Sequence, residues 1–140
     1  MTSTDNSNPS PQPAVKGGAI AYLQVDGAMR AAEFYKRAFG AELVAAQPVD
    51  DKGRTMHAHL YVNGGSLMLG DAYPEHGHPL EKPQGFSLVL SVDDADSWWK
   101  RAVAAGAEGV MPVADMFWGD RFGQVRDPFG VLWGVNQPKR

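Results

Sequence analysis

The internal repeat is the feature of this sequence that most restricts its fold. Leu23-Gln24-Val25-Asp26 aligns with Leu90-Ser91-Val92-Asp93, and Gly40-Ala41-Glu42 aligns with Gly106-Ala107-Glu108. In both copies the pattern predicts a strand, a helix and three further strands, in that order. Each half is too small to bury its own sheet face, so the two βαβββ halves are expected to pack against each other.

The first half is predicted to begin with a strand at residues 19–25 and a helix that ends at Gly40. Asp26 lies just before the helix and is expected to cap it, because a carboxylate accepts hydrogen bonds from the free N–H groups there. Asn63-Gly64 is typical of a type I′ hairpin. The three strands after the helix are predicted at residues 41–49, 54–62 and 66–69.

The second half is predicted to repeat this order after a linker rich in Pro, Gly and His at residues 73–85. Asp94 is expected to cap its helix and Gly106 to end it. Its four strands are predicted at residues 86–92, 107–113, 122–126 and 131–136.

The two halves predict an α+β fold in one domain at residues 18–140, with module one at 18–72 and module two at 86–137. Residues 1–17 are mainly Ser, Thr, Asn, Pro and Gln. Such a segment buries too little apolar surface to offset the entropy lost on ordering. We therefore expect a disordered N-terminal tail.

Charge and composition exclude several classes of partner. The net charge is −3 and the basic residues form no stripe, which argues against a nucleic-acid partner. The chain has no cysteine, so it forms no disulfide and no thiolate metal site. No apolar run approaches the ~18 residues of a membrane helix, and the N-terminus lacks the features of a signal peptide. We expect a cytoplasmic protein with no membrane partner.

The stretch at residues 115–123 combines large rings with charges and glycines. Phe117, Trp118 and Phe122 supply the rings, and such a mixture is typical of a surface that meets a ligand or another chain. Arg121 lies within this stretch. Its guanidinium either holds a carboxylate or phosphate of a ligand, or forms an ion pair with Asp115 or Asp120.

Two further pairs of residues are candidates for a site. His57 and His59 project from one face of a predicted strand, where two imidazoles can clamp a metal or pair a base with an acid. The alternative is that they line a polar pocket or an exposed face. Tyr22 and Gln24 also share one strand face, and a ring beside an amide suits a planar ligand with one polar edge. The alternative for Tyr22 is a place in the core.

These patterns resemble the vicinal oxygen chelate superfamily, the glyoxalase, bleomycin-resistance and extradiol-dioxygenase group. Asp127-Pro128-Phe129-Gly130 matches the usual turn of the superfamily before the last strand. The 115–123 stretch, with Phe34-Tyr35-Lys36 and Met56-His57-Ala58, is similar to its PhnB-like branch. The resemblance implies two βαβββ modules that form a curved mixed sheet around a cavity. It also implies a homodimer, because these domains often complete each cavity with a second copy.

The resemblance also implies where a metal would bind in such a protein. Metal-using members place one ligand on the first strand and one on the last strand of each module. The corresponding positions here are Ile20, Met68, Ser87 and Gly134. None of these side chains carries the imidazole or carboxylate that a divalent ion requires. We therefore expect neither a metal centre nor another cofactor.

Three functional hypotheses follow. The first is a binding protein that holds a small, aromatic molecule in its cavity without a metal, using Tyr22, Gln24, His57, His59, Phe117, Trp118, Arg121 and Phe122. The second is a metal-dependent lyase or isomerase with an unconventional site at His57 and His59. The third is an interaction module whose aromatic stretch serves dimerisation. The fold alone does not decide between them, because one architecture hosts many chemistries.

Overall fold

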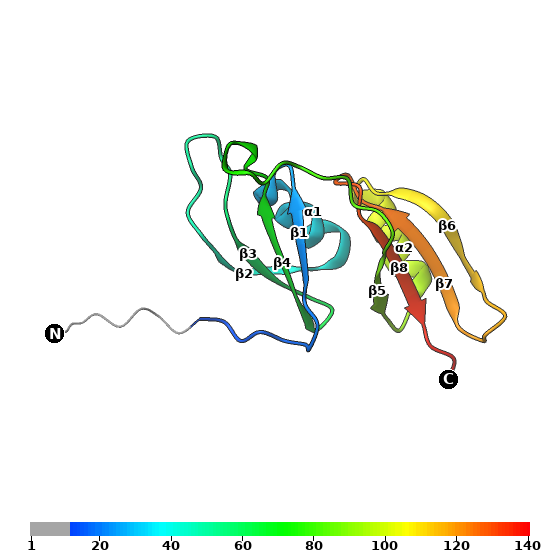
Figure 1. Ribbon diagram of the computed structural model, residues 1–140. Coiled ribbons are helices and arrows are strands. Elements are labelled where there is room, and N and C mark those ends of the chain that lie inside the picture. Colours follow the sequence, from blue (N-terminus) through cyan, green and yellow to red (C-terminus); the bar gives the residue numbers. More distant parts are fainter. Residues whose placement is uncertain (1–11) are drawn as a thin grey trace.

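The computed structural model describes residues 12–140 (Figure 1), so the expected tail at residues 1–11 lies outside the described part of the chain. Residues 12–17 form no helix or strand, but they are held against module one. The Tyr61 hydroxyl donates to the carbonyl of Ala14 at 2.7 Å. The backbone N–H of Ser66 donates to the carbonyl of Lys16 at 2.8 Å. Contact with the sheet therefore begins a few residues before Gly18.

Module one contains β1 (Ala21–Val25), α1 (Ala28–Phe39), β2 (Glu42–Ala46), β3 (Ala58–Val62) and β4 (Gly65–Asp71). Its strands form one sheet in the order β1-β4-β3-β2. β1 runs parallel to β4, whereas β3 is antiparallel to both of its neighbours. Asn63 and Gly64 both have positive φ values, 49° and 83°, which confirms the type I′ hairpin between β3 and β4.

Module two repeats this plan after a linker that contains the short 3₁₀ helix η1 (Pro74–His76). Its elements are β5 (Leu88–Ser91), α2 (Ala95–Ala105), β6 (Glu108–Asp115), β7 (Arg121–Arg126) and β8 (Leu132–Gln137). The strand order is β5-β8-β7-β6, and β5 runs parallel to β8. The fold is thus α+β with two βαβββ modules, as the repeat predicts. Each module forms its own mixed sheet of four hydrogen-bonded strands.

The inner strands of the two sheets are β1 and β5. Figure 1 shows β1 and β5 next to each other in the middle of the molecule, with β2 and β6 at the outer edges and both helices behind the sheets. The side chain of Asn63 donates to the carbonyl of Ser91 at 2.8 Å and ties the modules together at one end of this junction. None of the helices within residues 12–140 is long and apolar enough to cross a membrane.

The strand pairing shows which positions of the two modules are equivalent. Ala21 of β1 pairs with Leu67 of β4, and Leu88 of β5 pairs with Trp133 of β8. Met68 and Gly134, one residue further along, are therefore equivalent positions. Ile20 and Ser87, the residues before Ala21 and Leu88, correspond to each other through the sequence repeat. The pairing of Met68 and Gly134 at equivalent positions agrees with the sequence repeat, which aligns Ala21 with Leu88.

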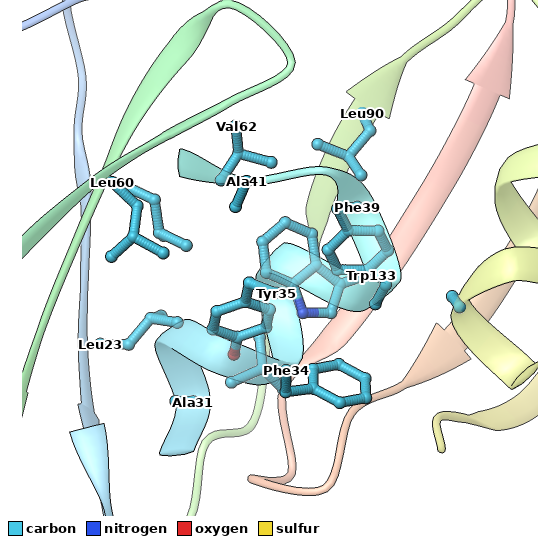
Figure 2. Close-up of a cluster of buried hydrophobic side chains, with 14 of the residues drawn as sticks. Leu23, Ala31, Phe34, Tyr35, Phe39, Ala41, Leu60, Val62, Leu90 and Trp133 are labelled. Carbon is cyan, nitrogen blue, oxygen red and sulfur yellow. The ribbon is translucent and has the colours of Figure 1, made fainter. Parts of the chain in front are cut away.

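The core lies between the sheets and is dominated by aromatic side chains of α1. Tyr35 and Phe39 are fully buried and contact Trp133 of module two, with ring centroids 5.4 Å and 4.7 Å apart. Figure 2 shows these rings between Leu23 and Leu60 of module one and Leu90 of module two. Because one aromatic cluster serves both modules, burial of its apolar surface stabilises their association as well as each module.

Helix α1 is capped differently from the sequence-based expectation. The residue before the helix is Gly27, which has no side chain, and Asp26 makes no capping hydrogen bond. The carboxylate of Asp71 instead accepts hydrogen bonds from the backbone N–H groups of Gly27 and Ala28, at 2.7 Å and 3.0 Å. Asp26 was chosen for its sequence position, whereas the working carboxylate comes from the end of β4. In module two, Asp94 caps α2 as predicted, by accepting from Ser97 at 3.2 Å.

Both outer edge strands are irregular. The register of β2 shifts between Leu43 and Ala45, and that of β6 shifts on both sides of Met111. Pro112 in β6 also has no N–H to donate. Bulges and proline weaken an edge as a template for a further strand. We therefore do not expect this protein to associate with other chains by extending its sheets.

Candidate ligand-binding cleft

Each sheet has one face packed on the helices and one face turned away from them, which we call the open face. In β1, Leu23 and Val25 are buried against the helices, whereas Tyr22 between them is 54% exposed. In β5, Leu90 is buried while Val89 is exposed. This alternation follows from the two-residue period of a strand. The two open faces flank the junction between β1 and β5.

Two hollows lie along the linker at this junction. The first has a volume of about 310 Å³ and is lined by Tyr22 and Gln24 of β1 and by Phe86. The second has a volume of about 410 Å³ and is lined by Phe86 together with Arg126 of β7 and Leu132 of β8. Both hollows share linker residues Lys82, Pro83 and Gln84. We call this pair of hollows the cleft, and its volumes are in the range of small-molecule sites.

Of the residues predicted for a site, Tyr22 and Gln24 lie in the cleft. His57 is their neighbour: its Nδ1 lies 3.1 Å from the Tyr22 hydroxyl, and the two rings are 5.6 Å apart. The Tyr22 hydroxyl also donates to the carbonyl of Met56 at 2.8 Å. These two contacts hold the tyrosine ring on the open face, although more than half of its surface is exposed. Tyr22 is therefore not part of the core.

His59 lies on the same sheet face but is buried. Its Nε2 is 2.7 Å from the Ser66 hydroxyl, and its ring contacts that of Tyr61 edge to face. Burial, with a smaller contribution from nearby His57, lowers the pKa of His59 below its usual value. The imidazole is therefore neutral at pH 7, and it serves as a hydrogen-bonding group of the sheet face.

The predicted aromatic wall lies at the hairpin between β6 and β7. Phe117 at its tip is 97% exposed, and Trp118 is 51% exposed. Trp118 packs on Phe122 with ring centroids 6.0 Å apart. The Phe122 ring covers Gly134 on the open face of module two, so close that a Cβ at Gly134 would lie 2.8 Å from it. These rings belong to module two, whereas Tyr22, Gln24 and the histidines belong to module one.

The side chain of Arg121 points away from the open face. It alternates with Phe122 along β7, so its side chain lies on the helix side of the sheet. The guanidinium pairs with Asp96 of α2 at 3.0 Å and with Asp115 at 2.8 Å. These carboxylates raise the pKa of Arg121. Of its two predicted roles, the ion pair with Asp115 is therefore present, and Asp120 is replaced as a partner by Asp96.

Sequence reasoning did not assign the cleft residues Arg126, Phe86 and Lys82 to a site. Arg126 shares a strand face with Phe122 and Gln124 and lines the larger hollow. Strand alternation alone could have placed it there. Phe86 and Lys82 come from the linker and the residue after it, where no periodicity indicates which side chains point inward.

The residues at the four superfamily ligand positions do not fit a metal ion. In the strand pairing, Tyr22 lies opposite Met68 and Val89 lies opposite Gly134. Neither Tyr22 nor Val89 carries a carboxylate or an imidazole, so neither replaces the missing metal ligands. At Gly134, the ring of Phe122 occupies the space that a longer side chain would need. His57 and His59 each lie beside a hydroxyl, and within residues 12–140 no three His, Cys, Asp or Glu side chains form a metal-binding cluster. The donor set therefore lacks what zinc and similar ions require.

Comparison with known proteins agrees with this architecture. Residues 18–135 match the Glyoxalase/Bleomycin resistance protein/Dioxygenase superfamily. Protein Mb0911c of Mycobacterium bovis is 39% identical over 125 residues, which cover 85% of this chain and 82% of that protein. Protein YjdN of Escherichia coli is 31% identical over 134 residues, which cover 87% of each chain.

Solved structures share this architecture. TioX from Micromonospora sp. ML1 superposes with a TM-score of 0.69 at 30% identity, and the match covers 86% of this chain and 98% of TioX. A PhnB protein from Bacillus cereus superposes with a TM-score of 0.63 at 20% identity, over 87% of this chain and all of that one. The PhnB protein thus shares the fold.

Proposed function

Because the chain belongs to the glyoxalase/bleomycin resistance protein/dioxygenase superfamily, we propose that it binds a small aromatic molecule in the cleft without the superfamily's metal centre. The observation that carries this proposal is the pair of half-exposed rings at the junction of the modules. Tyr22 is 54% exposed and Phe86 is 48% exposed, and both line the same hollow. Aromatic side chains that remain this exposed in a concave site favour a planar ligand that stacks between them.

A screen by thermal unfolding tests this proposal. A ligand present at about 100 times its dissociation constant stabilises the folded state by about 2.7 kcal/mol. We expect members of an aromatic library to raise the Tm of the wild-type protein, and Tyr22→Ala to weaken their binding by roughly tenfold, because the stacking surface is lost. The measurement is a titration of each hit by calorimetry.

The matched control for Tyr22→Ala is Val49→Ala, which truncates an exposed apolar side chain that does not line the cleft. Its affinity for the hits is expected to equal that of the wild type. An absence of any hit in a broad aromatic library would contradict the proposal, and so would equal affinities in wild type and Tyr22→Ala.

We also propose that the protein acts as a homodimer in which the aromatic hairpin of one copy contacts the other copy. Phe117 and Trp118 expose rings at a hairpin tip, and such exposed aromatic anchors are typical of binding hot spots. The irregular edges of β2 and β6 favour association through faces and this hairpin.

For this homodimer, Trp118→Ala is expected to raise the dimer dissociation constant at least about tenfold, because a hot-spot ring is removed. Analytical ultracentrifugation over a concentration series measures the change, with Leu80→Ala as a control for loss of an exposed apolar side chain elsewhere. A wild-type protein that remains monomeric at high concentration would refute the dimer. If Trp118→Ala dissociates the dimer and leaves ligand binding unchanged, the hairpin serves dimerisation alone.

The alternative of a metal-dependent lyase or isomerase receives no support from the side chains around His57 and His59. It would need a third ligand beside His57 and His59, and the side chains that approach their ring nitrogens are the hydroxyls of Tyr22 and Ser66. Binding without a metal is therefore the function that these residues support best.

A further inference from the structure

The charge of the larger hollow of the cleft is unbalanced. Its lining contains two basic residues, Lys82 and Arg126, and no acidic residue, while Phe86 and Leu132 supply apolar surface. The smaller hollow of the cleft differs, because Glu81 accompanies Lys82 there. A concave site lined by two basic residues and apolar walls favours a ligand that carries a negative charge on an apolar body.

Arg126 is the more precisely placed of the two basic residues. Its Nη1 donates to the carbonyl of Gly130 at 3.1 Å, which fixes the guanidinium beside the turn before β8. The ion pairs that arginines form within residues 12–140 involve Arg54, Arg121 and Arg140, but not Arg126. Glu108 is its partner across the strands, yet it forms no ion pair with it.

The remaining donors of Arg126 match one kind of ligand group. Its Nε and Nη2 donate no hydrogen bond to any described residue. Two adjacent N–H groups on a planar guanidinium match the two oxygens of a carboxylate or phosphate, and such charge-assisted pairs are strong and directional. A half-buried arginine that is held by one carbonyl and free on its other edge is prepared for such a partner.

We propose that Arg126, supported by Lys82, binds an anionic group of the ligand, a carboxylate or phosphate, while the aromatic body of the ligand lies against Phe86 and Tyr22. This inference rests on the proposed function and extends it by naming the chemical class of the ligand, an aromatic acid. The position of Arg126 favours this orientation, because Arg126 lines the larger hollow and Tyr22 lines the smaller one, while Lys82 lines both.

Calorimetric titration with three matched series tests the inference: aromatic carboxylates, the aryl phosphates of the same ring systems, and the neutral carboxamides. We expect wild-type protein to bind the anionic members at least about tenfold more tightly than the amides. Arg126→Gln is expected to abolish this ratio while amide binding remains, and Lys82→Gln is expected to reduce it. A preference between carboxylate and phosphate identifies which anion the site accepts.

Arg37→Gln is the matched control, because Arg37 also donates to a single backbone carbonyl, that of Ala105, at 3.1 Å. It is expected to leave the ratio unchanged. Amides that bind wild-type protein as tightly as the acids would overturn the anionic site but not the cleft. If both Arg126→Gln and Lys82→Gln keep the wild-type ratio of acid to amide affinity, the anionic site is likewise overturned but the cleft is not. If no series binds at all, the proposed function fails and this inference fails with it.

Discussion

Replacing Asp127 with alanine is expected to lower the free energy of unfolding by about 3–5 kcal/mol, because several donors lose their acceptor at once. The carboxylate is only 4% exposed and accepts four hydrogen bonds. Two come from the backbone N–H groups of Phe129 and Val131, which close the turn before β8. The other two come from the Trp133 indole, at 2.9 Å, and the Tyr35 hydroxyl. Alanine would leave all four buried donors without an acceptor.

The position of Tyr35 makes this effect reach both modules. Tyr35 belongs to α1 of module one, whereas Asp127 belongs to module two, so the carboxylate joins the halves of the protein. Burial, together with the nearby Asp127 charge, raises the pKa of Tyr35 well above its usual value. The phenol therefore stays protonated and remains a donor throughout the physiological range.

Urea denaturation followed by tryptophan fluorescence measures the loss in Asp127→Ala. Asp127→Asn keeps the shape of the side chain and one acceptor oxygen, so an intermediate loss is expected. Asp51→Ala, in an exposed turn, is the control and is expected to change stability by less than about 0.5 kcal/mol. A loss below about 1 kcal/mol in Asp127→Ala would contradict the assigned role.

Asp71→Ala is expected to produce the second-largest effect, a loss of about 2–4 kcal/mol of unfolding free energy. Asp71 is buried at the end of β4 and accepts hydrogen bonds from three backbone N–H groups, those of Gly27, Ala28 and Thr55. The first two start α1, and the third, at 2.9 Å, holds the segment that leads into β3. Alanine would leave the N-terminus of α1 uncapped and these donors unsatisfied.

The equivalent position in module two supplies the control for Asp71. Gln137 ends β8 as Asp71 ends β4, and its side-chain oxygen accepts one hydrogen bond, from the N–H of Ala95 at 3.0 Å. Because Asp94 also caps α2, Gln137→Ala is expected to cost no more than about 1 kcal/mol. Chemical denaturation of both variants compares the two positions, and equal losses would show that the carboxylate of Asp71 has no special part in capping α1.

The sequence repeat predicted the order of helices and strands because local periodicity determines it. The alternation in β1 and β3 and the glycines at the helix ends are local signals, and each element was found within a few residues of its predicted bounds. The cap of α1 could not be predicted in this way. Asp71 is far from Gly27 in sequence, and only the parallel pairing of β1 with β4 brings them together.

The candidate site was predicted only in part, for the same reason. Tyr22 and Gln24 were placed correctly on the open face because alternation along one strand fixes their direction. The separation of these residues from Phe117 and Trp118 depends on how the two modules are joined, which no local pattern specifies. The ion pair of Arg121 with Asp96 likewise depends on the packing of α2 on β7.

The hydrogen bond between Tyr35 and Asp127 prevents one module from being replaced by a second copy of the other. Module two has Ala102 at the place in its helix where module one has Tyr35, and the corresponding turn of module one is Asn63-Gly64, which has no carboxylate. Each half thus carries one member of the pair and lacks the other. Two copies of the same half, joined head to tail, could not rebuild this contact. The two modules are therefore complementary and not interchangeable.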